Sequence, residues 1–62
     1  MINFEKGDIN IVFSFLNMKL RDEFSTLDSF TNYYSIDKEM ILKRMEENGY
    51  FYNSKTNQFK KI

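Results

Sequence analysis

Apolar side chains recur between residues 9 and 23 at the spacing of an α-helix. One stripe of the helical wheel carries Ile9, Val12, Phe13, Leu16 and Leu20. Spacing of this kind is typical of a helix face that packs on a core. Asp8 stands just before the stripe, and its carboxylate can accept the first free amide hydrogens. We therefore expect a first helix over about residues 9–23, with Asp8 as its N-cap.

The same pattern predicts two more helices, over about residues 26–34 and 38–48. Their apolar stripes are Leu27, Phe30 and Tyr34 in the first, and Ile41, Leu42 and Met45 in the second. The run Ser25-Thr26-Leu27-Asp28 resembles a capping box with Asp28 at the third helical position. Asp37 is the expected N-cap of the last helix, and Gly49 can adopt the left-handed conformation that ends it.

The remaining residues predict a small β-hairpin over about residues 50–61. Aromatic residues at 50–52 favour a strand, and the polar residues at 53–57 favour a turn before Phe59. Loops of four and of five residues would place different residues opposite Phe59, so the register stays open. Two strands alone are marginally stable, so the hairpin should lie on the helices. The expected fold is mainly α: a three-helix, helix-turn-helix-like domain with a short C-terminal β-hairpin, forming a single small domain over residues 1–62.

The first helix also has a second apolar side, made of Ile11, Phe15 and Met18. Either the hairpin aromatics cover it or it is a partner surface of the kind that exposed apolar patches mark. If this side is a partner surface, its occupant is either a second copy of the chain, which gives a homodimer, or an unknown protein partner. Beside it run Asn17 and Arg21, which we expect to form an inter-helix hydrogen-bond network, also involving Asp28, or a partner-binding edge.

A nucleic-acid interface is the alternative function. The second and third helices, with a tight turn at Ser35-Ile36 and the hairpin as a diminutive wing, would suit a minimal winged-helix-like DNA- or RNA-binding protein. The candidate contacts are Lys43, Arg44, Lys55, Lys60 and Lys61. Acidic residues on the same helix, at Glu39, Glu46 and Glu47, would oppose phosphate binding. Partner binding, through the aromatic tail or the second apolar side of the first helix, is therefore preferred.

Composition narrows the chemistry further. The 62 residues include nine basic and nine acidic side chains and no cysteine, histidine, proline or tryptophan. Disulfides, thiolate nucleophiles and zinc–cysteine sites are excluded, and the usual neutral-pH acid/base is missing. We expect a non-enzymatic protein with no catalytic residues, cofactor or metal. No apolar run is long enough to span a membrane and no signal peptide is present, so the expected location is the cytoplasm.

Several short runs carry a resemblance to a known family. They are Asn17-Met18-Lys19-Leu20-Arg21-Asp22, the aromatic Phe24 with Ser25-Thr26-Leu27-Asp28, Gly49-Tyr50-Phe51-Tyr52-Asn53, and Asn57-Gln58-Phe59. Together they resemble the short bacterial proteins called domain of unknown function 4250. Similar sequences often have proline after the Asp that begins the first helix, where this chain has Ile9. The resemblance implies no particular activity, and it implies a complete small protein with an interaction or regulatory role left open.

Overall fold

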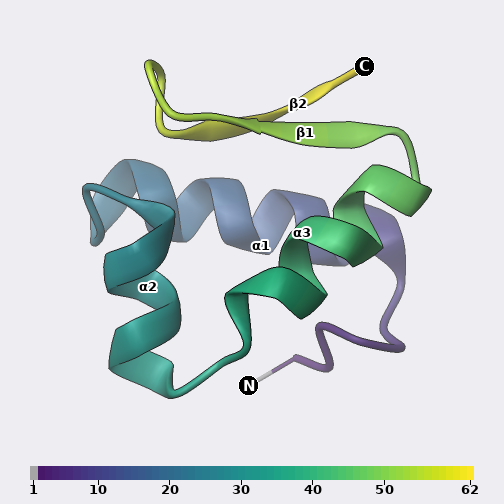
Figure 1. Ribbon diagram of the computed structural model, residues 1–62, viewed down its shortest axis with the longest axis horizontal. Helices are drawn as coiled ribbons and strands as arrows, with labels where there is room; N and C mark the ends of the chain where they lie inside the picture. The colour runs from purple at the N-terminus through teal and green to yellow at the C-terminus, as the bar shows by residue number, and fades with distance from the viewer. Residues whose placement is uncertain (1) are drawn as a thin grey trace.

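Three helices and an antiparallel hairpin follow one another in the computed structural model, which describes residues 2–62 (Figure 1). The elements are α1 (Ile9–Asp22), α2 (Leu27–Tyr34), α3 (Lys38–Glu47), β1 (Tyr50–Asn53) and β2 (Gln58–Lys61). The predicted fold class is confirmed. Each helix begins and ends within one residue of its predicted boundaries. The domain expected over residues 1–62 includes Met1, which lies outside the described residues.

Two of the three predicted helix caps are confirmed, and the third is shifted by one residue. Asp8 accepts hydrogen bonds from the amides of residues 10 and 11, and Asp37 does the same for residues 39 and 40. At α2 the N-cap is Thr26, not Ser25, so the third helical position is Ser29 instead of Asp28. The Thr26 hydroxyl accepts from the Ser29 amide at 3.0 Å, and the Ser29 hydroxyl accepts from the Thr26 amide at 3.3 Å. Two hydroxyls thus form the capping box, which leaves the Asp28 carboxylate free for another partner.

The core lies between the helices and the inner side of the hairpin. Its buried apolar residues are Phe4, Val12, Leu16, Leu20, Leu27, Phe30, Ile41, Met45 and Phe59. The hairpin forms a layer across α1 and α3, with β2 against α1 and β1 against α3, while α2 crosses at one end (Figure 1). Phe4 enters the core from the segment before α1, a contribution that the helical pattern did not predict. The hairpin therefore covers helices and does not project as a wing.

The hairpin has a four-residue loop, which decides the register that the sequence left open. Tyr52 pairs with Phe59, and Tyr50 pairs with Lys61. The loop closes at Asn57, which adopts a left-handed conformation with φ of 55°, and the chain enters β1 through Gly49 at φ of 87°. Both positions use residues that tolerate positive φ, as expected for a tight hairpin and a helix end.

Candidate functional site

The second apolar side of the first helix, which the sequence left either covered by the hairpin or exposed, carries two exposed side chains. Ile11 is 58% exposed and Met18 is 39% exposed. The two residues stand two turns apart, so their side chains lie on the same side of the helix. No charged residue occurs between Asp8 and Lys19, which leaves this face uncharged over almost three turns. We call Ile11, Phe15 and Met18 the outer face of α1.

Phe15, between them, is half-buried and is covered from an unexpected direction. Its ring lies 5.8 Å from the ring of Phe4, centroid to centroid, and Lys19 Nζ lies 5.6 Å from its centroid. The hairpin covers a different residue of α1, because Tyr50 stacks on Phe13 with the two ring centroids 4.4 Å apart. The N-terminal segment, and not the hairpin, therefore limits how much of Phe15 the solvent reaches.

Asn17 forms a hydrogen-bond network with the hairpin. A hydrogen-bond network was one of the two roles predicted for it, the other being a partner-binding edge. Its Nδ2 donates to the carbonyl of Phe59 at 3.0 Å, and its Oδ1 accepts from the amide of Phe59 at 2.7 Å. Gln58 reinforces the contact by donating from Nε2 to the carbonyl of Asn17 at 3.1 Å. These bonds join two segments far apart in the sequence, and they commit the polar groups of Asn17 to the fold.

A second group of bonds, which the sequence did not predict, surrounds Asn57. Its Nδ2 donates to the carbonyls of Leu20 at 2.9 Å and Phe24 at 2.8 Å, both near the C-terminal end of α1. Its Oδ1 accepts from the Tyr52 hydroxyl at 2.6 Å, and that hydroxyl also accepts from the amide of Leu27 at 3.2 Å. Asn57 and Tyr52 thus connect the hairpin to α1 and to the start of α2, where carbonyls and amides lack helical partners.

Arg21 does not join either network. It forms a two-pronged pair with its neighbour Asp22, at 2.9 and 3.1 Å, and both side chains are at least half exposed. This hydrogen bond lowers the pKa of the Asp22 carboxyl below its ordinary value. The predicted partner Asp28 instead pairs with Lys38 Nζ at 2.8 Å, which raises the pKa of that lysine. The predicted Arg21–Asp28 link is therefore wrong, whereas Arg21 remains exposed beside the outer face of α1.

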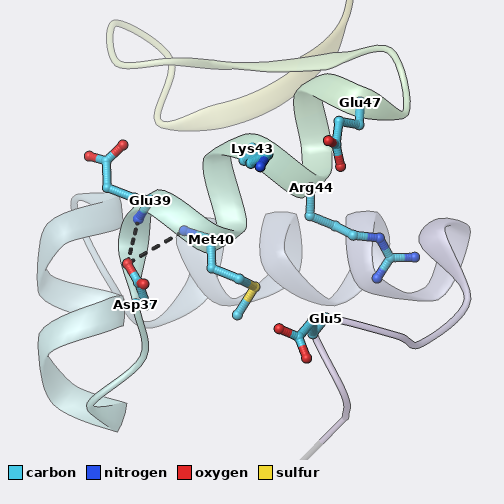
Figure 2. A pocket seen from close by; sticks show the side chains of 7 residues that line it. All are labelled: Glu5, Asp37, Glu39, Met40, Lys43, Arg44 and Glu47. Atoms are coloured by element: carbon cyan, nitrogen blue, oxygen red, sulfur yellow. Dashed lines mark hydrogen bonds between the residues drawn. The ribbon is translucent and has the colours of Figure 1, made fainter.

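The exposed side of α3 faces a shallow hollow of about 450 Å³ (Figure 2). Its lining residues are Glu5, Asp37, Glu39, Met40, Lys43, Arg44 and Glu47. Figure 2 shows the Arg44 guanidinium turned toward the N-terminal segment, where it donates to the carbonyls of Phe4 at 3.0 Å and Gly7 at 2.7 Å. Lys43 is exposed, but Glu39 and Glu47 stand one turn away on either side of it. Carboxylates therefore dominate the helix face that would have to meet phosphates.

The other basic candidates lie on the hairpin. Lys55 is exposed in the loop, while Lys60 and Lys61 are exposed on β2. Phe51 is opposite Lys60 in the hairpin and is 43% exposed. The structure thus distributes the five basic candidates over two elements and a loop, with Arg44 withdrawn into hydrogen bonds of the fold.

Within residues 2–62, no group of three or more aspartate or glutamate residues is arranged to hold a metal ion. Nor does that part of the chain contain a helix that is both long and apolar enough to cross a membrane. The candidate sites described above are three surfaces: the outer face of α1, the hollow beside α3, and the hairpin.

The chain thus folds as a small three-helix domain that is covered by a hairpin. The model of the family described as "Domain of unknown function (DUF4250)" matches residues 6–59, so the chain belongs to that family. No curated protein and no solved structure matches the chain. Several of the runs that carried the resemblance meet in three dimensions, since Asn17 bonds to Phe59 and Asn57 bonds to Leu20 and Phe24. A structural role accounts for those polar residues.

Proposed function

We propose that the chain is a non-enzymatic interaction or regulatory module of the bacterial cytoplasm, and that it binds a protein partner through the outer face of α1. The observation that supports this most is the exposure of Ile11 and Met18 within residues 9–18 of α1, a stretch that contains no charged side chain. The centres of protein interfaces are depleted in charge and enriched in Met and aromatic residues. Arg21, exposed at the end of this face, fits a polar rim around such a centre.

The placement of the other polar residues supports the same surface. Asn17 and Arg44 are held in hydrogen bonds within the fold, so they are not available to recognise a partner. Ile11 is 58% exposed, whereas Phe4 packs on Phe15 and partly covers it. A partner would therefore bury apolar area that folding leaves in water, and that area is the source of affinity.

The test is capture of partners from a native lysate with three versions of a tagged protein. We expect the unmodified chain and Thr56→Lys, which adds the same charge on the exposed hairpin loop, to retain the same partner. Met18→Lys should lose it, because a charge is buried without a counter-charge at the interface. Equal capture by all three, with unchanged circular dichroism, would contradict the proposal. The homodimer predicted through α1 is the other occupant of this face, and loss of a dimer on Met18→Lys in sedimentation equilibrium would identify it.

Nucleic-acid binding is the second candidate function, and one observation favours it. Lys55, Lys60 and Lys61 are all exposed on one hairpin, and Lys60 lies opposite Phe51, whose aromatic ring is also exposed. Lysine and aromatic residues together can contact phosphates and stack on bases. A gel shift with random-sequence DNA and RNA over a salt series tests it: binding that weakens steeply with salt would support this function. Absence of binding at low salt would exclude it.

A further inference from the structure

The two edges of the hairpin differ in how their backbone groups are used. At the outer edge of β2, the amide and the carbonyl of Phe59 both bond to the carboxamide of Asn17. A side chain of α1 thus takes the place that a further strand would occupy. Another strand could pair there only by displacing α1, so this edge is closed.

The outer edge of β1 is open. The amide of Ile62 donates to the carbonyl of Gly49 at 2.8 Å, which makes 49/62, 51/60 and 53/58 the hydrogen-bonded pairs of the antiparallel ladder. The intervening residues, Tyr50 and Tyr52, therefore turn their amides and carbonyls away from β2. No partner for these groups occurs among residues 2–62. Their side chains are directed inward, where Tyr50 stacks on Phe13 and Tyr52 lies 5.4 Å from Phe59, ring to ring.

Apart from the short length of β1, this open edge lacks the features that usually prevent pairing. Exposed edges are commonly protected by charged side chains, proline or a bulge. Residues 49–54 contain no charge and no proline, whereas β2 carries Lys60 and Lys61. At the middle of the open edge Phe51 stands between the two tyrosines with 43% of its surface exposed. An uncharged strand with unpaired backbone groups and an exposed aromatic centre is suited to receive another strand.

We propose that β1 pairs antiparallel with β1 of a second copy of this chain, about a two-fold axis at Phe51. In this register Tyr50 lies opposite Tyr52 of the partner subunit, and each such pair exchanges both of its N–H···O bonds. Phe51 then faces Phe51 of the partner subunit in the non-hydrogen-bonded position, where Cα atoms are about 4.5 Å apart and side chains pack closely. The product is a continuous four-stranded sheet with Asn17 closing both of its outer edges.

Charge favours the antiparallel copy as occupant. The chain enters β1 from the acidic end of α3, at Glu46 and Glu47, and leaves it toward Lys55 in the loop. Antiparallel pairing of two identical strands places the acidic end of each beside the basic end of the other. A pairing of strands this short buries less than the roughly 1,000 Å² of a stable interface, so the dimer should be weak and concentration-dependent. The proposal is independent of the outer face of α1.

A cysteine placed at the two-fold axis provides the first test, since the chain has no cysteine of its own. The Phe51→Cys variant should form an intermolecular disulfide in a glutathione redox buffer, because the expected Cα separation lies in the range that disulfides accept. Lys60→Cys, on the same outer side of the hairpin but on β2, is the matched control. We expect at least tenfold more cross-linked dimer for Phe51→Cys; equal yields would overturn the proposed register.

Sedimentation equilibrium provides the second test. The unmodified chain should associate as concentration rises toward the millimolar range, and Phe51→Glu should remain a monomer, because two carboxylates would meet at the axis. The hairpin of that variant keeps its fold, since Lys60 lies opposite the new carboxylate. N-methylation of Tyr52 in a synthetic chain should also give a monomer, whereas N-methylation of Lys61, whose amide points outward from β2, should not.

Met18→Lys separates the two surfaces, because it should leave this dimer unchanged. A dimer that is lost on Met18→Lys and kept on Phe51→Glu would overturn the β1 pairing. An unmodified chain that stays monomeric at millimolar concentration would overturn it as well.

Discussion

Asn17 holds Phe59 by both of its backbone groups, with Nδ2 donating to the carbonyl at 3.0 Å and Oδ1 accepting from the amide at 2.7 Å. A carboxamide has the same donor and acceptor as a peptide group, so this side chain acts as a single unit of a neighbouring strand. The ring of Phe59 is buried in the core on the inner side of the hairpin. One contact thus sets the position of β2 on α1.

Replacing Asn17 should destabilise the domain substantially. In Asn17→Ala the partly buried amide and carbonyl of Phe59 lose their partner, at a cost of about 1–3 kcal/mol. A domain of this size has only about 3–5 kcal/mol of core stabilisation, so a large fall in melting temperature follows. Urea unfolding measures the loss. Asn10→Ala, on the exposed side of the same helix, is the control and should change stability by no more than about 0.5 kcal/mol.

Asn17→Asp should make this stability depend on pH. A carboxylate still accepts from the Phe59 amide but faces the Phe59 carbonyl without a proton to donate, so folding favours its protonated form. Its pKa is then higher in the folded than in the unfolded state. The variant should be most stable below the unfolded pKa and lose stability as the pH rises through the folded pKa. A pH-independent difference from the unmodified chain between pH 3 and 7 would contradict the assignment of the two bonds.

Asn57 combines a strained backbone with a side-chain network, and two variants separate these effects. Asn57→Gly relieves the positive φ but removes the bonds to Leu20, Phe24 and Tyr52, so we expect a net loss of about 1–2 kcal/mol. Asn57→Ala should lose roughly a further 1 kcal/mol, because alanine disfavours the left-handed region. Thermal unfolding gives the ranking.

Ser35 is the matched control for this pair, since it has the same φ of 55° and an exposed side chain. Ser35→Gly should leave stability unchanged or raise it by up to about 1 kcal/mol. If Asn57→Gly were as stable as the unmodified chain, the network around Asn57 would contribute nothing.

Arg44 should act on the segment before α1. Arg44→Gln removes charged hydrogen bonds to the carbonyls of Phe4 and Gly7, and we expect a loss of about 1–2 kcal/mol together with faster amide exchange at residues 4–7. Lys43→Gln removes the same charge from an exposed neighbouring position and should have little effect on either measurement. Similar exchange at residues 4–7 in both variants would show that Arg44 does not hold this segment.

The Arg21–Asp22 pair should be visible in a titration. Because the pKa of Asp22 is lowered in the folded state, its contribution to stability is present above the ordinary carboxyl pKa and is lost as pH falls through the folded value. NMR of the side-chain carboxyl follows the titration directly. Arg21→Gln should return the pKa toward its ordinary value, and about 1 M salt should do much the same, since both side chains are exposed. A pKa unchanged by Arg21→Gln would assign the shift to another cause.

The parts of the fold that the sequence predicted are those decided within a few residues. Apolar spacing and the caps at Asp8 and Asp37 involve local contacts, so the helices were predicted almost to the residue. Ser25 and Thr26 are equivalent as capping hydroxyls until the turn after α1 selects Thr26. The hairpin register depends on Asn17 and Asn57 meeting carbonyls and amides of distant segments, which no local pattern encodes.

For the candidate surfaces too, the sequence predicted what depends on local spacing and missed what depends on contacts between distant segments. Helical spacing placed Ile11 and Met18 on one side of the helix, because that property belongs to a single helix. Their exposure depends on how the hairpin and the N-terminal segment pack, and the sequence left it open. Arg44 looked like a surface base in the sequence, yet its partners are backbone carbonyls some forty residues earlier. The open edge of β1 became recognisable only with the register, which determines where Tyr50 and Tyr52 direct their backbone groups.

Phe4 determines how much of the outer face of α1 is exposed to solvent. Its ring lies against Phe15 and Phe30, and the turn that follows it closes at Gly7, where an added Cβ would stand 2.5 Å from the carbonyl oxygen of Asn3. A truncated chain beginning at Asp8 would uncover Phe15 and enlarge the apolar face of α1. We expect such a chain to bind apolar surfaces more strongly and less selectively, because the leading residues no longer cover part of the apolar face of α1.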